Sequence, residues 1–293
     1  MSTEAIERFA VIGGGLMGSG IAEIVARAGV DTVVIEVNTA AAEAAQGRVS
    51  ASLARGVGRG KLTQDEADET MARLRFLTDF EAVADRELVV EAASEREDVK
   101  TEIFRRVGQI LTSSEAVLAS NTSSIPIVKL GAASGRPEQV MGVHFFNPAP
   151  VMQLVELIPS LTTGVDTLTR MRRFVTDQLG KEAIDATDRA GFIVNSLLVP
   201  YLLSAIRMYE AGYAKATDID RGMVLGCGHP MGPLALSDLI GLDTIRAIGA
   251  SLYEEFKEPL YSPPPLLERM VEAGLLGKKS GHGFYPYQRD ARG

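Results

Sequence analysis

The 293-residue sequence predicts an α/β fold, in which a doubly wound, mostly parallel sheet with a helical insertion precedes an all-α C-terminal domain. Short apolar segments alternate with helical patterns through the first part of the chain, as is typical of a parallel sheet covered by helices on both faces. A glycine-rich turn joins the first apolar segment to the first helical pattern. Farther along, only long helical patterns remain, and the chain is longer than one core usually supports. We therefore predict two domains, residues 1–187 and 188–293.

The strands of the predicted sheet are short apolar runs bounded by turn residues. They are expected at residues 9–12, 32–37, 88–92, 117–119, 140–145, 154–158 and 183–186. The first helix follows the glycine turn and ends at Gly29, and another is expected over residues 166–179. Residues 39–75 hold an Ala-rich stretch and an acidic helix that Thr63 and Glu66 open with capping-box spacing. This segment is predicted to be a helical insertion into the first domain.

The second domain is predicted to contain only helices. Helical patterns run over residues 192–210, ending before Gly212, and over residues 234–256. A proline-rich turn at residues 262–265 follows the second pattern. The boundary between the two domains is expected near residues 187–191.

Composition and charge exclude several classes of protein. Hydrophobic residues make up 46% and charged residues 23%, which is ordinary for a globular chain and not for a disordered one. The net charge of -8 argues against a nucleic-acid surface, which needs clustered Lys and Arg. Cys227 is the only cysteine, so no intramolecular disulfide can form, and with three histidines no metal site is expected. A polar, acidic N-terminal segment and the lack of long apolar runs predict a cytoplasmic protein without membrane segments.

The glycine turn has the context of a dinucleotide-binding motif of the Rossmann type. Gly13-x-Gly15-x-x-Gly18 lies between a predicted strand and a predicted helix, and Glu36 lies near the end of the next strand. Such glycines allow a tight turn, backbone contact with pyrophosphate and close helix packing, while the acidic side chain accepts a hydrogen bond from the ribose 2′-hydroxyl. The acidic side chain also repels a 2′-phosphate, so NAD is favoured over NADP. The predicted cofactor-binding residues of this region are Gly13, Gly15, Leu16, Met17, Gly18 and Glu36.

A histidine lies in one of the predicted strands, where a purely structural role would be the ordinary interpretation. If residues 140–156 turn about Pro150, His144 and Glu156 become cross-strand partners. A carboxylate beside an imidazole fixes its tautomer, which suits a proton-transferring base. His144 and the Ser-Asn-Thr-Ser segment at residues 120–123 both fall at carboxyl ends of strands, where the ligand crevice of a doubly wound sheet forms. His144 is therefore the predicted general base.

A series of segments resembles, in the same order, the motifs of the 3-hydroxyacyl-CoA dehydrogenase family, especially its short-chain bacterial members, the 3-hydroxybutyryl-CoA dehydrogenases. The segments are Gly13-Gly-Gly-Leu-Met-Gly-Ser-Gly20, Val89-Val-Glu-Ala92, Ala119-Ser-Asn-Thr-Ser-Ser124, His144-Phe-Phe-Asn-Pro148, Gly191-Phe-Ile-Val-Asn195, Pro230-Met-Gly-Pro233 and Gly277-Lys-Lys-Ser-Gly-x-Gly-Phe-Tyr285. The resemblance covers nearly the whole chain. It implies an NAD-dependent oxidoreductase of fatty-acid or butanoate metabolism that transfers a hydride to or from C3 of a short (S)-3-hydroxyacyl-CoA. It also implies a homodimer formed through the C-terminal helical domain.

The resemblance further implies roles for individual residues. His144 is then the base of the oxidative reaction and Glu156 its partner, while Ser123 and Asn195 bond oxygen atoms of the substrate. The residues implied to contact the cofactor are Glu95, Lys100, Ser123, Asn147 and Lys279. The expected contacts with CoA are Ser123, Arg55, Arg59 and Lys61. The glycines among these basic residues depart from the family's pattern.

Two other functions remain open on the sequence. A dehydrogenase for a free small hydroxy acid would share the nucleotide-binding fold and a helical second domain. A redox-sensing or assembly protein would bind NAD(H) without turnover, although the presence of both His144 and Glu156 argues against it. The other histidines, His229 and His282, lie in turns and are interpreted as structural or solvated.

Overall fold

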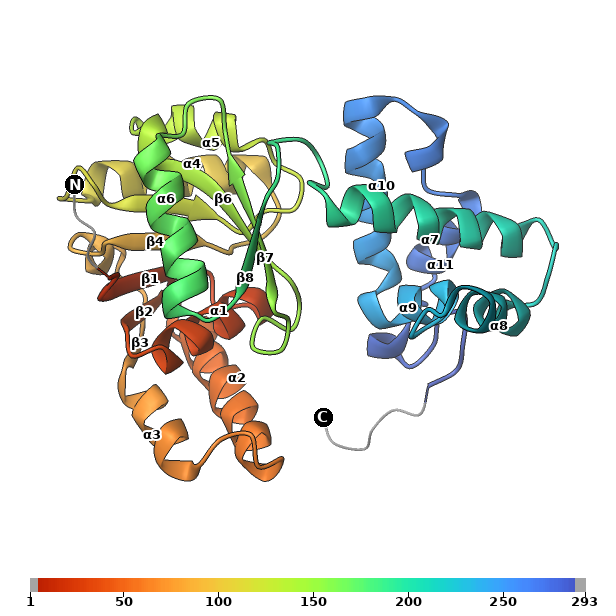
Figure 1. Cartoon of the computed structure of the whole chain (residues 1–293), viewed down its shortest axis with the longest axis horizontal. Coiled ribbons are helices and arrows are strands. Elements are labelled where there is room, and N and C mark those ends of the chain that lie inside the picture. Colours follow the sequence, from red (N-terminus) through yellow and green to blue (C-terminus); the bar gives the residue numbers. More distant parts are fainter. Residues whose placement is uncertain (1–4, 288–293) are drawn as a thin grey trace. The chain divides into compact units, whose positions relative to one another are not determined.

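The computed structural model of the chain describes residues 5–287 and divides into two compact units, Met1–Asp188 and Arg189–Gly293 (Figure 1). The first unit is built on a sheet, and the second contains helices and two isolated β-bridges. Within the described residues, no helix is both long enough and apolar enough to cross a membrane.

In the described part of the first unit, eight strands form one sheet in the spatial order β3-β2-β1-β4-β5-β6-β7-β8. The strands are β1 Arg8–Ile12, β2 Asp31–Ile35, β3 Leu74–Leu77, β4 Leu88–Glu91, β5 Val117–Ser120, β6 Val140–Phe145, β7 Leu154–Pro159 and β8 Glu182–Asp185. Neighbours from β3 to β6 pair in parallel, β7 runs antiparallel to β6, and β8 is parallel to β7. The predicted mostly parallel sheet is confirmed. Its chain order reverses between β1 and β4, which is where such a sheet forms its ligand crevice.

Helices cover both faces of this sheet, and Figure 1 shows α6 lying across the front of the strands. The helices of the first unit are α1 Leu16–Arg27, α2 Thr39–Gly58, α3 Gln64–Ala72, α4 Glu97–Ile110, α5 Ile127–Ser134 and α6 Val165–Arg173, which continues into a π-helical turn, Phe174–Gln178. The central strands β4 and β5 are buried along their whole length, because helices pack on both sides of them. Buried apolar side chains therefore pack on both faces of the sheet.

The helical insertion contains α2 and α3, which extend together away from the sheet in Figure 1. The predicted capping box is confirmed: Thr63 accepts a hydrogen bond from the Glu66 backbone, and the Glu66 side chain accepts one from the Thr63 N–H. The helical insertion predicted over residues 39–75 ends at Ala72, the last residue of α3, and residues 74 and 75 belong to a strand. The chain there enters the edge strand β3, in which Arg75 interrupts the apolar residues.

The second unit has its own apolar core, built by helices α7 Val194–Glu210, α8 Ala216–Cys227, α9 Pro233–Ile240, α10 Leu242–Phe256 and α11 Pro265–Glu272. The prediction of one helix over residues 234–256 was wrong. Gly241 has a φ of 105°, a conformation that L side chains rarely adopt, and it separates α9 from α10. The helix over residues 192–210 is confirmed, beginning two residues later than expected.

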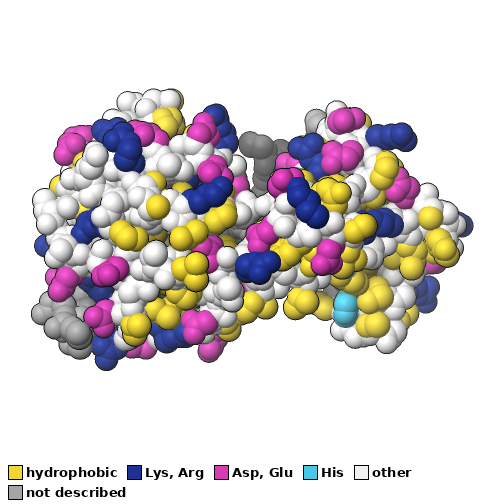
Figure 2. Space-filling view, turned by 90° about the horizontal axis from the view of Figure 1, so that it is seen from above, with side chains coloured by type: hydrophobic (Ala, Val, Ile, Leu, Met, Phe, Trp, Pro, Cys, Tyr) yellow, Lys and Arg dark blue, Asp and Glu magenta, His cyan; other side chains and the backbone are white. Residues whose placement is uncertain are grey.

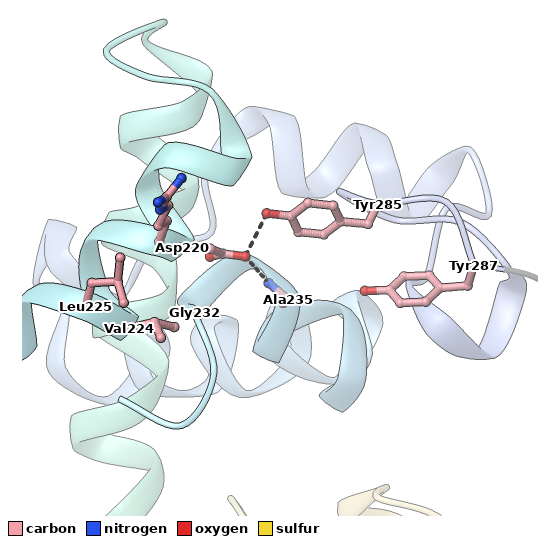
Figure 3. Close-up of a pocket in the computed structure, with 8 residues that line it drawn as sticks. Asp220, Val224, Leu225, Gly232, Ala235, Tyr285 and Tyr287 are labelled. Atoms are coloured by element: carbon pink, nitrogen blue, oxygen red, sulfur yellow. Dashed lines mark hydrogen bonds between the residues drawn. The ribbon is translucent and has the colours of Figure 1, made fainter. Parts of the chain in front are cut away.

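Two buried aspartates tie the last described segment to the helices of the second unit. Asp220 of α8 accepts hydrogen bonds from the backbone of Leu234 and Ala235 and from the Tyr285 hydroxyl, as Figure 3 shows in part. Asp238 of α9 accepts hydrogen bonds from residues 284 and 285 and from the Tyr287 hydroxyl. Burial, with the charge of Asp238 nearby, raises the pKa of Tyr287 to about 12. The segment is thus held by charge-assisted hydrogen bonds.

Candidate active site

The glycine turn between β1 and α1 has the shape that a bound pyrophosphate requires. Gly13 has a φ of 95°, and a Cβ there would lie 2.8 Å from the Ala92 carbonyl oxygen. A Cβ on Gly18 would lie 1.7 Å from the Gly13 carbonyl oxygen, so α1 packs directly on the turn. A Cβ on Gly15 would have no heavy atom within 4 Å, and Gly15 begins α1 without a side-chain cap. The turn therefore leaves room and backbone N–H groups for a phosphate.

Glu36 lies just after β2 and accepts a hydrogen bond from this turn. One oxygen of its carboxylate accepts a hydrogen bond from the Gly14 N–H at 2.6 Å, and the other accepts one from the Val37 N–H at 3.1 Å. The Gly14 carbonyl oxygen accepts hydrogen bonds from Ser19 and from Arg48 of α2. The position of Glu36 beside the turn fits recognition of the adenosine ribose. Arg48 has no counterpart in the motif and was missed by the sequence reasoning.

The hairpin of β6 and β7 brings the predicted base and carboxylate together. His144 pairs directly with Glu156 in the strand register, and its Nδ1 lies 2.7 Å from a Glu156 carboxylate oxygen. Glu156 is fully buried and His144 is 5% exposed. The cross-strand pairing predicted from the sequence is confirmed. When the Nδ1–H group of His144 donates a hydrogen bond to Glu156, Nε2 is the nitrogen of the neutral ring that can accept a proton.

A serine from the turn after β5 completes this line of side chains. The Ser123 hydroxyl oxygen lies 3.0 Å from His144 Nε2. The turn is fixed to β6 because the Asn121 side chain accepts a hydrogen bond from the Phe145 N–H at 2.9 Å. Phe146 packs edge-on against the His144 ring, with ring centres 4.7 Å apart. Ser123, His144 and Glu156 thus form a continuous hydrogen-bonded row at the carboxyl edge of the sheet.

Glu95, on the loop after β4, holds the same turn from the other side. Its carboxylate accepts hydrogen bonds from the Thr122 hydroxyl, the Ser123 N–H and the Ser124 hydroxyl. Burial by itself raises the pKa of Glu95. The Lys100 ammonium and the hydrogen bonds from the turn outweigh burial, so the pKa lies below its usual range.

Lys100 is enclosed rather than presented to a ligand. It is 1% exposed, and its ammonium lies 2.7 Å from Glu91 and 3.2 Å from Glu95. Lys100 therefore contacts Glu95, and any effect of Lys100 on a ligand acts through that carboxylate. The sequence reasoning missed Glu91, Asn121 and Thr122, although a carboxylate in the otherwise apolar β4 signals a buried partner.

The remaining predicted residues lie in different places. Asn147 is exposed just after β6, and its peptide bond to Pro148 is cis. Arg55 lies in the last turn of α2, with Arg59 and Lys61 following; all three are exposed. The helix continues through Gly56 and Gly58 despite their low helix propensity. These basic residues form an exposed cationic end to the insertion.

Asn195 and Lys279 belong to the second unit. Asn195 is half-buried in the first turn of α7, and the Lys279 ammonium lies 2.6 Å from Asp243. The structure brings Ser123, His144 and Glu156 together within the first unit. Among residues 5–287, no cluster of three or more His, Cys, Asp or Glu could hold a metal ion.

Comparisons with known proteins give one consistent result. The chain matches the model of the 3-hydroxyacyl-CoA dehydrogenase NAD binding domain over residues 8–189 and that of the 3-hydroxyacyl-CoA dehydrogenase C-terminal domain over residues 191–287. It is 54% identical over 285 residues to a 3-hydroxybutyryl-CoA dehydrogenase of Mycobacterium tuberculosis, a match covering 97% of this chain and 100% of the relative. A probable 3-hydroxybutyryl-CoA dehydrogenase of Deinococcus radiodurans is 45% identical, with 96% and 100% covered.

Solved structures agree with these relatives. The crystal structure of M. tuberculosis FadB2 has a TM-score of 0.96 and 55% identity, covering 97% of this chain and 100% of the other. The structure of (S)-3-hydroxybutyryl-CoA dehydrogenase PaaH1 from Ralstonia eutropha has a TM-score of 0.91 and 40% identity, with the same coverage.

Proposed function

The chain belongs to the 3-hydroxyacyl-CoA dehydrogenase family, and from this premise we propose that it interconverts (S)-3-hydroxybutyryl-CoA and acetoacetyl-CoA with NAD(H). The family resemblance stated from the sequence is confirmed. The observation that carries the chemistry is the row Ser123, His144 and Glu156 beside a dinucleotide-binding turn. A sensor that only binds NAD(H) has no need of a buried carboxylate aligned with a histidine.

The cofactor is NAD, and the residues at the turn fit it. Gly13, Gly15 and Gly18 leave the backbone accessible to pyrophosphate, and we propose that Glu36, which lies beside this turn, bonds a ribose hydroxyl. We propose that Leu16, Met17, Glu95, Asn147 and Lys279 add further contacts. When bound, the nicotinamide accepts or supplies the hydride.

We propose that His144 transfers the proton. In the oxidative direction Nε2 accepts the proton of the 3-hydroxyl, while Glu156 stabilises the imidazolium that forms. In the reductive direction the same nitrogen returns the proton. The Ser123 hydroxyl, 3.0 Å from Nε2, bonds the substrate oxygen together with Asn195. Arg55, Arg59 and Lys61 supply the positive charge that the CoA phosphates need.

The function is tested by following NADH absorbance at 340 nm. We expect NADH consumption with acetoacetyl-CoA and none with free acetoacetate, because the CoA contacts supply binding energy that the acid lacks. Equal rates with both compounds would favour a free hydroxy-acid dehydrogenase. Binding of NADH without turnover of either would favour the sensor. A substrate series from four to sixteen carbons would define the acyl pocket.

We infer that the protein is a cytoplasmic homodimer joined through its second unit. Figure 2 shows apolar side chains on one face of this unit. Three large apolar side chains of the unit are mostly exposed: Leu197 is 73%, Tyr213 82% and Leu225 71% exposed. Leu225 and Val224 line an open pocket of about 580 Å³ beside Asp220 and Tyr285 (Figure 3). Apolar surface of this kind is typical of protein interfaces. The cytoplasmic location rests on the bacterial relatives and the single cysteine.

Leu225→Glu is expected to convert the dimer to a monomer, because a charge would be buried at the interface without a partner. Light scattering coupled to size-exclusion chromatography measures the mass. Leu161→Glu is the matched control: Leu161 is 96% exposed in the first unit, so that variant should keep the mass of the wild type. A dimer that survives Leu225→Glu unchanged would place the interface elsewhere.

A further inference from the structure

Glu91 is a fully buried carboxylate at the last position of β4. One of its oxygens accepts hydrogen bonds from the Lys100 ammonium at 2.7 Å and from the Ala93 N–H at 2.6 Å. The other accepts one from the Ser120 hydroxyl at 2.7 Å. Ser120 ends the neighbouring strand β5, so Glu91 joins the carboxyl ends of two strands at the edge that carries the candidate active site. The mechanism proposed above does not use it.

The charges around Glu91 do not cancel. The Lys100 ammonium is paired with both Glu91 and Glu95. Two carboxylates and one ammonium leave a net charge of minus one. Glu91 and Lys100 are 0% and 1% exposed, so water screens their charges less than it would at the surface, whereas the Glu95 side chain is 43% exposed.

The cluster of Glu91, Glu95 and Lys100 lies on the nicotinamide side of the proposed cofactor site. This placement rests on the proposed function. A dinucleotide crosses a doubly wound sheet at the switch between β1 and β4. Glu36, after β2, marks the adenosine side of that switch. The nicotinamide half then extends over the ends of β4 and β5, where Glu91 and Glu95 lie.

We propose that Glu91, acting with Lys100 and Glu95, makes the site favour the oxidised over the reduced cofactor. The nicotinamide ring carries a positive charge in NAD⁺ and none in NADH. A net negative charge at the ends of β4 and β5 therefore attracts only the oxidised ring. Without Glu91, the Glu95–Lys100 pair would be neutral and this preference would be lost. Glu91 is thus a positioning and charge-setting residue that acts through Lys100 and Ser120.

The test is the ratio of the two dissociation constants, measured by NADH fluorescence and by its displacement with NAD⁺. In Glu91→Gln, which keeps the size of the side chain, we expect Kd(NAD⁺)/Kd(NADH) to rise about three- to tenfold over wild type. Glu91→Asp keeps the charge, so its ratio should stay at the wild-type value. Glu87→Gln is the matched control, because Glu87 precedes the first residue of the same strand and contacts Arg8 at the opposite edge of the sheet.

An unchanged ratio in a folded Glu91→Gln protein would overturn the inference, as would an equal rise in Glu87→Gln or in Glu91→Asp. If Glu91→Gln does not fold, Glu95→Gln removes the same charge from the half-exposed member of the cluster and must raise the ratio in the same way. Wild-type protein that binds neither form of the cofactor would instead refute the proposed function. The two failures are therefore distinguishable.

Discussion

Replacing His144 with glutamine is expected to lower kcat for acetoacetyl-CoA reduction by about 10²-fold or more. Glutamine has about the size of the imidazole and can still form hydrogen bonds, but its amide cannot accept and return the proton that His144 Nε2 exchanges with the substrate oxygen. NADH binding should be unchanged, because the glycine turn and Glu36 lie outside the hairpin that carries His144. Steady-state kinetics and NADH fluorescence measure the two effects separately.

The control for this variant is His229→Gln in the second unit. His229 contacts the Tyr201 hydroxyl at 3.1 Å and has no part in the proposed chemistry, so kcat should stay near the wild-type value. Near-normal turnover of His144→Gln would refute the role of His144. Loss of NADH binding in that variant would point instead to damage at the cofactor site.

Gly18→Ala is expected to lower the free energy of unfolding by about 1–3 kcal/mol and to weaken NADH binding at least about tenfold. The added Cβ would lie 1.7 Å from the Gly13 carbonyl oxygen, so α1 must move away from the turn. That movement displaces the N–H groups that bind pyrophosphate. Urea denaturation and NADH fluorescence measure the two quantities.

Gly15→Ala separates binding from stability at the same turn. Its Cβ would contact no heavy atom within 4 Å, so the free energy of unfolding should change little. The methyl group would nevertheless occupy the space in which the backbone approaches the phosphates, so NADH binding should weaken as in Gly18→Ala. Normal NADH binding by Gly15→Ala would mean that the cofactor does not lie against this turn.

Much of the fold follows from local signals in the sequence. The strand, glycine turn and helix at residues 9–28 have characteristic residues at fixed spacing, and the turn geometry leaves little freedom. The pairing of His144 with Glu156 was predictable because two neighbouring apolar segments flank a turn that contains Pro150. The break at Gly241 was not predictable, because the residues on both sides of it have one continuous helical pattern.

The candidate site was predictable only in part, and for a physical reason. The hydrogen bond from Ser120 to Glu91 depends on β4 and β5 lying side by side, which no local pattern specifies. Lys100 lies in a charged segment whose sequence pattern indicates a solvent-exposed helix, yet its side chain is buried. The contribution of Arg48 to the glycine turn depends likewise on the packing of α2.

The antiparallel pairing of β6 with β7 has a consequence for how the protein is made. Glu156 follows His144 by only 12 residues, and Ser123 precedes His144 by 21, so the proposed proton-transfer row involves short loops and low contact order. On the ribosome, these residues and the glycine turn are all synthesised before the first residue of the helical unit. Because domains generally fold as they emerge, with the N-terminal one first, the row can assemble while the second unit is still untranslated. Translation errors in the second unit would then leave the geometry of His144 and Glu156 as it was.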